Sequence, residues 1–240
     1  MDVTDRVSLP RNRSTISREN SAVSACANKD FDLILNEIKP LPESSSLSPK
    51  AVDEIMQSAA KIVGDVSVDW KKRINSLKQL RSLCADPIHH AQIVAYVRHL
   101  VPPMQSAVKD LRSQVGREAC ITVAFLAKRL GSKGDIFVDL LLGSMFSLLI
   151  ANAKIVSITG TSTIATIYDS VHSYRLIPPL LVQMQQKAKD IRRVVCMATK
   201  IVLQSWPSNI VNRNPQTLQE VVKKVNIVIF TSFTLPCTIS

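Results

Sequence analysis

The chain is poor in the residues and patterns that build β-sheets and catalytic sites. It has 6 glycines in 240 residues, and it has few runs in which β-branched residues alternate with polar ones. An all-β fold is therefore excluded. No HExxH, P-loop or GxSxG sequence occurs in the chain, and these are the patterns that hold a catalytic metal, a nucleotide phosphate or a nucleophilic serine. We therefore expect no enzymatic activity, no catalytic residue, no small-molecule substrate and no cofactor.

The cysteines and histidines do not form a pattern that predicts disulfides or a metal site. Five cysteines are an odd number, and no two have CxxC spacing: Cys26, Cys84, Cys120, Cys196 and Cys237. They are typical of reduced, buried thiols in a cytosolic or nuclear protein. His89 and His90 are adjacent on a predicted helix and point apart. We expect the histidines to be surface or capping residues, and we predict no metal ligand.

Targeting and membrane signals are also missing. The N-terminus is polar and charged, which is unlike a secretory signal. The most apolar run, residues 136–151, contains Asp139 and Gly143 and is shorter than the ~20 residues of a membrane span. It is better interpreted as a buried core helix, and no membrane partner is expected.

The net charge of +11 is unevenly distributed along the chain. Acidic and basic residues balance in the first 50 residues, so the whole positive excess falls within residues 51–240. A basic folded module suits an acidic partner, such as nucleic acid, an anionic membrane or an acidic protein surface.

One four-residue pattern occurs twice, 80 residues apart. It reads Lys109-Asp110-Leu111-Arg112 and then Lys189-Asp190-Ile191-Arg192, and each copy opens a stretch with helical periodicity. Related openings lie at residues 69–72 and 152–155, so successive openings are about 40 residues apart. This is the period of two-helix HEAT-type repeats. The sequence predicts an all-α HEAT-repeat solenoid of antiparallel helix pairs.

The predicted domain organisation has three parts. Residues 1–48, rich in Ser, Asn, Arg and Pro, are expected to be a mostly disordered tail, in which residues 31–38 can form a short helical turn. Residues 49–225 are expected to hold four full repeats and part of a fifth. Residues 226–240 carry no charge, whereas the last element of a repeat array needs a polar outer face. We interpret them as an altered or truncated end, with a short buried terminal segment as the alternative.

Helix boundaries follow from the apolar stripes and the turn residues. The two helices of the first repeat are expected on either side of Asp69, and those of the second within residues 88–130. In the second repeat, Pro102-Pro103 should kink or break the first helix. The second helix should follow Asp110 with Leu111 facing inward. The third and fourth repeats are expected at 135–172 and 175–206, and a fifth begins with a helix over 216–225.

Basic residues recur at the start of each second helix. They are Lys71, Lys72 and Arg73 in the first repeat, Lys109 and Arg112 in the second, Lys154 in the third, and Lys187, Lys189, Arg192 and Arg193 in the fourth. A cation at a helix N-terminus opposes the macrodipole by ~0.3–1 kcal/mol. Asp69, Asp110 and Asp190, interpreted as N-caps, offset part of this cost. Repeated placement against the dipole indicates a functional ridge, although a single lysine of this kind is usually a solvated surface residue.

Trp70 stands beside this ridge, just after the predicted N-cap. It either packs on the preceding helix or anchors a partner, because an exposed Trp flanked by cations is typical of an interface hot spot.

Several of these segments resemble one family. Residues 68–83, beginning Val68-Asp69-Trp70-Lys71, are similar to the first repeat of a TOG domain of the CLIP-associating protein (CLASP) family. Residues 109–122 are similar to its second-repeat helix, and residues 152–155 and 175–178 match its pattern in order. The resemblance covers about residues 66–206 and is greatest to the second TOG domain of the family.

This resemblance implies a tubulin-binding module of six HEAT repeats that acts on microtubule dynamics in interphase and at the mitotic spindle, hence in cell division. It implies a location in the cytoplasm on the microtubule cytoskeleton, with αβ-tubulin as the partner. A first-repeat aromatic and basic residues in later loops contact tubulin in that family. They correspond to Trp70, Lys109, Arg112, Lys154 and Arg192, and less securely to Lys189 and Arg193. Lys71 and Lys72 flank the aromatic and join the predicted site.

The resemblance has two limits. The second helix of the fifth repeat and the whole sixth repeat are not recognisable. Ser14-Thr15-Ile16-Ser17 lacks the proline of an end-binding-protein motif. Two other functions fit a basic helical array, a nucleic-acid-binding solenoid and a general scaffold. Nucleic-acid readers repeat an aromatic or paired polar side chains in each module, and here only the first repeat has an aromatic.

Overall fold

The chain forms an array of antiparallel helix pairs. The structure is a computed structural model that describes residues 31–151 and 153–233, and within these ranges it contains no β-strand. The all-α HEAT-repeat solenoid predicted from the ~40-residue period is confirmed. The α-helices that follow residue 48 are α2 (Pro49–Gly64), α3 (Trp70–Cys84), α4 (His90–Val108), α5 (Ser113–Leu130), α6 (Asp135–Ser147), α7 (Lys154–Ser170), α8 (Ile177–Met184), α9 (Lys189–Ser205), α10 (Ser208–Val211) and α11 (Pro215–Phe233).

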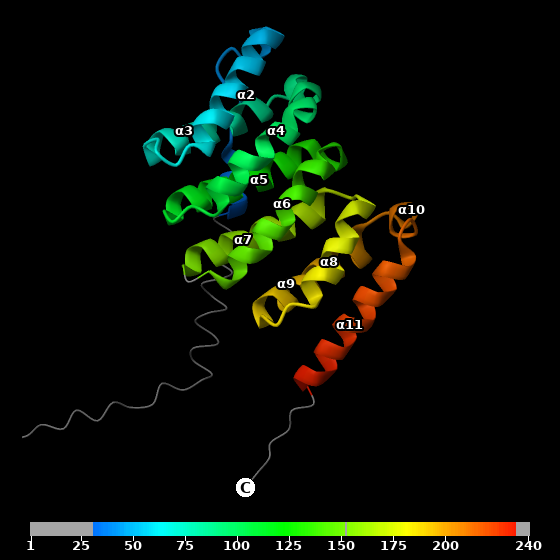
Figure 1. Cartoon of the computed structure of the whole chain (residues 1–240). Helices are drawn as coiled ribbons and strands as arrows, with labels where there is room; N and C mark the ends of the chain where they lie inside the picture. The colour runs from blue at the N-terminus through cyan, green and yellow to red at the C-terminus, as the bar shows by residue number, and fades with distance from the viewer. Residues whose placement is uncertain (1–30, 152, 234–240) are drawn as a thin grey trace, which may run out of the picture.

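The helices lie in two layers (Figure 1). The first helices of the pairs, α2, α4, α6 and α8, stack in one layer, and α11 extends that layer by packing against α8. The second helices, α3, α5, α7 and α9, stack in the other layer. Short 3-10 helices connect one pair to the next at Pro87–His89, Gly131–Gly134 and Tyr174–Leu176, and another, Leu148–Ile150, extends α6. Each pair therefore contacts mainly its neighbours, as expected for a solenoid.

Local sequence explains why the first pair forms. The Ser48 side chain accepts a hydrogen bond from the Ala51 N–H, and Pro49 occupies the first turn of α2, where its missing N–H costs nothing. The Asp69 side chain accepts from the Lys71 N–H at the start of α3. The apolar stripe of α2 is buried through Val52, Met56, Ala59 and Val63.

Three details of the predicted boundaries are wrong. The helix is not broken at Pro102-Pro103: α4 runs through both prolines, and Val101 and Met104 on either side of them are buried in the core. α5 begins at Ser113, and Leu111 is fully exposed and does not face inward. Asp110 and Asp190 are not N-caps: Arg112 is the N-cap of α5 and Ala188 that of α9. Asp190 lies within the first turn of α9, where a carboxylate still complements the dipole.

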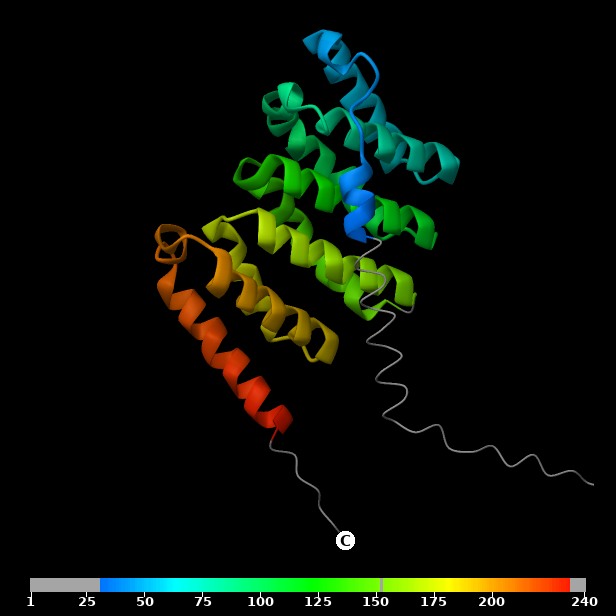
Figure 2. The same ribbon diagram turned by 180° about the vertical axis from the view of Figure 1, so that it is seen from behind.

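The segment before α2 is partly ordered. Residues 31–37 form a helix, whose Phe31 and Leu35 are buried in the core. This helix lies behind α5 and α7 in Figure 1 and in front of them in Figure 2, and Asn36 accepts a hydrogen bond from Lys128 of α5. Ser44–Ser46 form a 3-10 helix that is tied to His89 by hydrogen bonds. The helical turn allowed for residues 31–38 is therefore present over residues 31–37, the expected disordered tail does not extend over residues 44–46, and residues 1–30 lie outside the described residues.

The C-terminal segment also differs from the expectation. α11 begins near the predicted residue 216 but continues to Phe233, so residues 226–233 prolong one helix and do not form a separate segment. Leu218, Val221 and Val225 are buried. Residues 234–240 lie outside the described residues.

The core is made of helix faces, and its polar groups are satisfied. Buried Tyr168 donates a hydrogen bond to the Leu176 carbonyl, and the Trp206 indole donates to the Tyr168 carbonyl. Gly160 lies within α7, where an added Cβ would come within 3.3 Å of Leu148 Cβ, so this glycine allows close packing. Cys84 and Cys120 are buried free thiols, and burial raises the pKa of each to about 12.

Candidate protein-interaction edge

The four loops that join the two helices of each pair lie along one edge of the array. Figures 1 and 2 show the loops before α3, α5, α7 and α9 following one another on the same side. We call this the loop edge and define it as residues 65–72, 109–113, 151–154 without residue 152, and 185–193. It contains every residue of the predicted basic ridge except Arg73.

The first loop is a rigid turn. Asp65 Oδ1 accepts hydrogen bonds from the Ser67 N–H at 2.9 Å and from the Ser67 hydroxyl at 2.6 Å. The Ser67 hydroxyl is the main cause that lowers the pKa of Asp65. Such a turn fixes the direction in which the chain enters α3.

Trp70 is the first residue of α3 and is half-buried. The Lys71 Nζ atom lies 5.6 Å from the centroid of its ring, within the range of a cation–π contact. A hollow of about 490 Å³ opens beside the ring between α3 and α5, and its charged lining residues are Lys71, Lys78, Arg117 and one acid, Glu118. Trp70 therefore packs on the core with one part and faces a basic hollow with the other. Lys72 is exposed.

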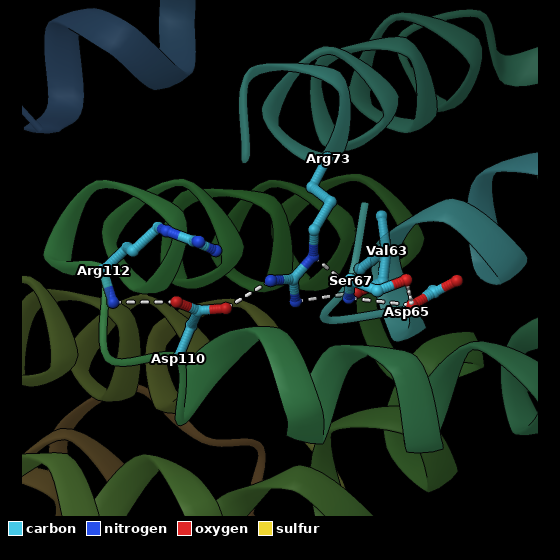
Figure 3. A network of polar contacts seen from close by, with 6 residues as sticks. All are labelled: Val63, Asp65, Ser67, Arg73, Asp110 and Arg112. Carbon is cyan, nitrogen blue, oxygen red and sulfur yellow. Dashed lines mark hydrogen bonds and ion pairs between the residues drawn. The ribbon is translucent and has the colours of Figure 1, made fainter. Parts of the chain in front are cut away.

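Arg73 does not belong to the exposed ridge and corrects the sequence-based prediction. It is fully buried, and its guanidinium donates two hydrogen bonds to the Val63 carbonyl, at 3.1 and 2.9 Å. It also pairs with Asp110 (Figure 3). One signal in the sequence indicates this position, because Arg73 continues the inward stripe of Leu77, Leu80 and Cys84 at helical spacing.

Asp110 holds the second loop in shape. One carboxylate oxygen pairs with Arg73, and the other accepts a hydrogen bond from the Arg112 N–H at 2.7 Å (Figure 3). Because these two bonds hold Asp110 outside the helix, α5 begins three residues after Asp110, at Ser113. Leu111 is left fully exposed between Lys109 and Arg112, whose side chains are also exposed.

The third and fourth loops supply further cations. Lys154 is the exposed first residue of α7. Lys189 and Arg193 are exposed on the first turn of α9, whereas Arg192 is half-buried. The Arg192 guanidinium donates to the carbonyls of Gln186 and Lys187 at 2.8 and 2.6 Å, so this residue closes its own loop as well as adding charge.

Exposed apolar residues accompany the cations, and sequence reasoning missed them. Val66, Leu111 and Ile155 are 65%, 102% and 46% exposed, and each lies on or next to the loop edge in a different repeat. Nine Lys and Arg residues of the loop edge outnumber its four Asp residues, which are Asp65, Asp69, Asp110 and Asp190, and Asp110 is neutralised by Arg73. The loop edge therefore presents apolar side chains within a positive field, a composition that suits a protein partner with an acidic surface.

Other kinds of site are not seen in the described part of the chain. Within residues 31–151 and 153–233, no group of three or more His, Cys, Asp or Glu side chains is placed to hold a metal ion. No helix of those residues is long and apolar enough to cross a membrane.

Comparison with known proteins identifies relatives over most of the chain. The family model described as CLASP N terminal matches residues 52–228. CLIP-associating protein 1 of Xenopus tropicalis is 31% identical over 196 residues, which are 81% of this chain and 14% of that protein. CLIP-associating protein of Drosophila melanogaster is 31% identical over 77% of this chain and 13% of that protein. Protein CLASP-2 of Caenorhabditis elegans is 28% identical over 87% of this chain and 20% of that protein. The chain therefore spans less than a quarter of each relative.

Proposed function

The chain belongs to the CLASP N-terminal family, and from that premise we propose that its loop edge binds αβ-tubulin. The single observation that supports this proposal is the arrangement of the loop edge. Four consecutive loops bring cations and exposed apolar side chains to one side of a rigid array. The surface of tubulin is acidic overall, so it is complementary to this edge.

Folding does not explain the placement of Lys189. It begins α9, where the positive end of the helix dipole repels it by ~0.3–1 kcal/mol. Leu111 exposes its whole side chain to water, which stabilises nothing within the chain. A partner that covers the loop edge would offset both costs, the repulsion of a cation by the helix dipole and the exposure of Leu111 to water.

Four residues are proposed as the centre of the contact. Trp70 would anchor it, since part of the ring is accessible beside the basic hollow and half-buried Trp residues are often hot spots. Leu111 would insert an apolar side chain one repeat further on, with Lys109 and Arg112 steering acidic groups to it. Lys71, Lys72, Lys154, Lys189, Arg192 and Arg193 would extend the contact to both sides.

Through this contact the chain would act as a microtubule-associated module in the cytoplasm that regulates microtubule dynamics, including at the mitotic spindle during cell division. It would do so by binding, with no reaction catalysed.

The test is a charge reversal with a matched control. The double variant Lys109→Glu/Arg112→Glu should lose binding to purified αβ-tubulin in a thermophoresis titration. Its melting temperature should stay close to that of the wild type. Glu at Arg112, the N-cap of α5, complements the dipole of that helix, whereas Glu at Lys109, the C-cap of α4, opposes the dipole of α4 by a similar amount. The control Arg98→Glu/Lys133→Glu makes the same change in net charge at two exposed positions outside the loop edge. It should bind within about twofold of the wild type. Equal losses in both double variants would mean that overall charge, and not the loop edge, determines binding.

A further inference from the structure

The hollow between α3 and α5 begins at the loop edge and extends along both helices away from it. Its volume is about 490 Å³, and the two helices are neighbours in the layer of second helices (Figure 1). Its lining residues come from α3 between Trp70 and Lys78 and from α5 between residues 114 and 118. Only Trp70 and Lys71 among them belong to the loop edge. Most of this α3–α5 hollow is therefore a surface of its own.

Three cations line the α3–α5 hollow without a carboxylate partner. Lys71 and Lys78 are exposed and Arg117 is half-buried, and none of the three forms an ion pair with another of the described residues. Glu118, the acid in the lining, is already engaged, because the Arg81 guanidinium donates to Glu118 Oε2 at 2.7 Å. The fold thus uses the negative charge of the hollow and leaves its positive charges uncompensated.

The uncharged lining residues suit a peptide. Trp70 and Ile74 are half-buried and supply an apolar wall, whereas Asn75 and Gln114 are exposed and their amides can donate to backbone carbonyls. A peptide offers such carbonyls along its whole length. Single-stranded nucleic acid is bound by stacking successive bases on several aromatic side chains, and the hollow has one aromatic residue, Trp70.

The cations on α3 have a spacing that an extended chain can match. Lys71 and Lys78 are seven positions apart, which is about 10 Å along a helix. Alternate side chains of an extended chain lie on one face, about 7 Å apart. Three carboxylates at alternate positions therefore span about 13 Å and reach both lysines, with Arg117 opposite them on α5.

We propose that the α3–α5 hollow binds an extended, glutamate-rich segment of a partner protein. Its carboxylates would pair with Lys71, Lys78 and Arg117, and its backbone carbonyls would accept hydrogen bonds from Asn75 and Gln114. This proposal does not rest on tubulin binding by the loop edge. Because Lys71 belongs to both surfaces, the hollow is tested through Lys78 and Arg117, which lie outside the loop edge.

The probe is a fluorescein-labelled peptide of about eight residues in which Glu alternates with Thr, so that the carboxylates share one face of the extended chain. One control peptide has Gln and another has Lys in place of every Glu. In fluorescence anisotropy at physiological ionic strength, the Glu peptide should bind about tenfold or more tightly than either control. Equal binding of the Glu and Gln peptides, or no binding of the Glu peptide, would overturn the proposal. Tighter binding of an oligouridylate of the same length would identify nucleic acid as the occupant and would also overturn it.

Variants of the chain locate the bound peptide. Lys78→Glu/Arg117→Glu should weaken binding of the Glu peptide by about tenfold or more, and Lys78→Gln/Arg117→Gln should weaken it less. The control Arg98→Glu/Lys133→Glu changes net charge as much as the first variant does, at two exposed positions outside the hollow. It should bind within about twofold of the wild type, since charges beyond ~8 Å are largely screened. A similar loss in the control would mean that overall charge attracts the peptide, and the proposal would fail.

Tubulin separates this proposal from the function proposed for the loop edge. Lys109→Glu/Arg112→Glu should lose tubulin binding and keep binding of the Glu peptide. A wild-type chain that binds tubulin but not the peptide would refute only the proposal for the hollow. A wild-type chain that binds the peptide but not tubulin would refute only the function proposed for the loop edge.

Trp70 gives a second readout, because it lines the hollow and is half-buried, whereas Trp206 is buried. Quenching of tryptophan fluorescence by acrylamide therefore reports mainly on Trp70. A saturating concentration of the Glu peptide should lower the quenching constant by about twofold, because interface contacts exclude solvent, and the Gln peptide should not. Unchanged quenching with the Glu peptide bound would place that peptide elsewhere and would refute the proposal.

Discussion

Replacing Arg73 should both destabilise the array and loosen the loop edge. In Arg73→Leu, the Asp110 carboxylate, whose side chain is 6% exposed, loses its counter-ion, and the Val63 carbonyl loses two hydrogen bonds. Removing one partner of a buried ion pair costs about 3–5 kcal/mol, because the remaining charge is left without compensation. Urea denaturation followed by circular dichroism should therefore show a loss of this size in the free energy of unfolding.

Arg81 provides a matched control for this prediction. It is also buried, and it pairs with Glu118 at 2.7 Å, away from the loop edge. Arg81→Leu should destabilise less, since the Glu118 side chain is 17% exposed and can be partly hydrated. At a temperature where both variants are folded, only Arg73→Leu should speed hydrogen exchange at residues 111–113 and weaken tubulin binding.

A double variant separates the lost charge pair from the other effects. Asp110→Asn keeps a side-chain oxygen that can accept from the Arg112 N–H but carries no charge. Arg73→Leu/Asp110→Asn should therefore be more stable than Arg73→Leu alone. Two results would refute the reasoning. One is a free energy of unfolding of Arg73→Leu within about 1 kcal/mol of the wild-type value, and the other is a double variant that is less stable than Arg73→Leu.

Three further predictions concern the loop edge and the thiols. Trp70→Ala should weaken tubulin binding by about 2 kcal/mol, or about thirtyfold in Kd by calorimetry; an unchanged Kd in a folded variant would show that Trp70 only packs. Leu111→Asp should reduce tubulin binding by about tenfold with no loss of melting temperature, because the side chain is fully exposed; a drop of several degrees would contradict its placement. In a chain with Cys26→Ser and Cys237→Ser, Cys84 and Cys120 should resist Ellman's reagent at pH 8, where their raised pKa of about 12 keeps both thiols protonated; reaction of either in the folded chain would refute its burial.

The helix pairs are predictable from sequence because their signals are local. Apolar stripes at helical spacing, the Asp69 cap and Pro49 at the start of α2 act within a few residues. The ~40-residue period then fixes how the pairs stack. The unbroken α4 was not predictable in this way, because packing on both sides of Pro102 overrides the local preference of proline.

The chemistry of the loop edge was only partly predictable for the same reason. Arg73 and Lys72 are adjacent cations, yet one is buried and the other exposed. The difference depends on Asp110, which is 37 residues away. The pairing of Asp110 with Arg73 also delays the start of α5 and turns Leu111 outward. Leu111, which the sequence assigned to the core, is therefore a candidate contact residue for a partner. Long-range pairing of this kind leaves no periodic signal in the sequence.

The most direct test of the central claim is hydrogen–deuterium exchange of the chain with and without αβ-tubulin. If the loop edge is the binding site, tubulin should protect residues 65–72, 109–113, 153–154 and 185–193. It should leave the connections between pairs, at residues 87–89, 131–134 and 174–176, unchanged. Protection of these connections without protection of the loop edge would contradict the proposed function.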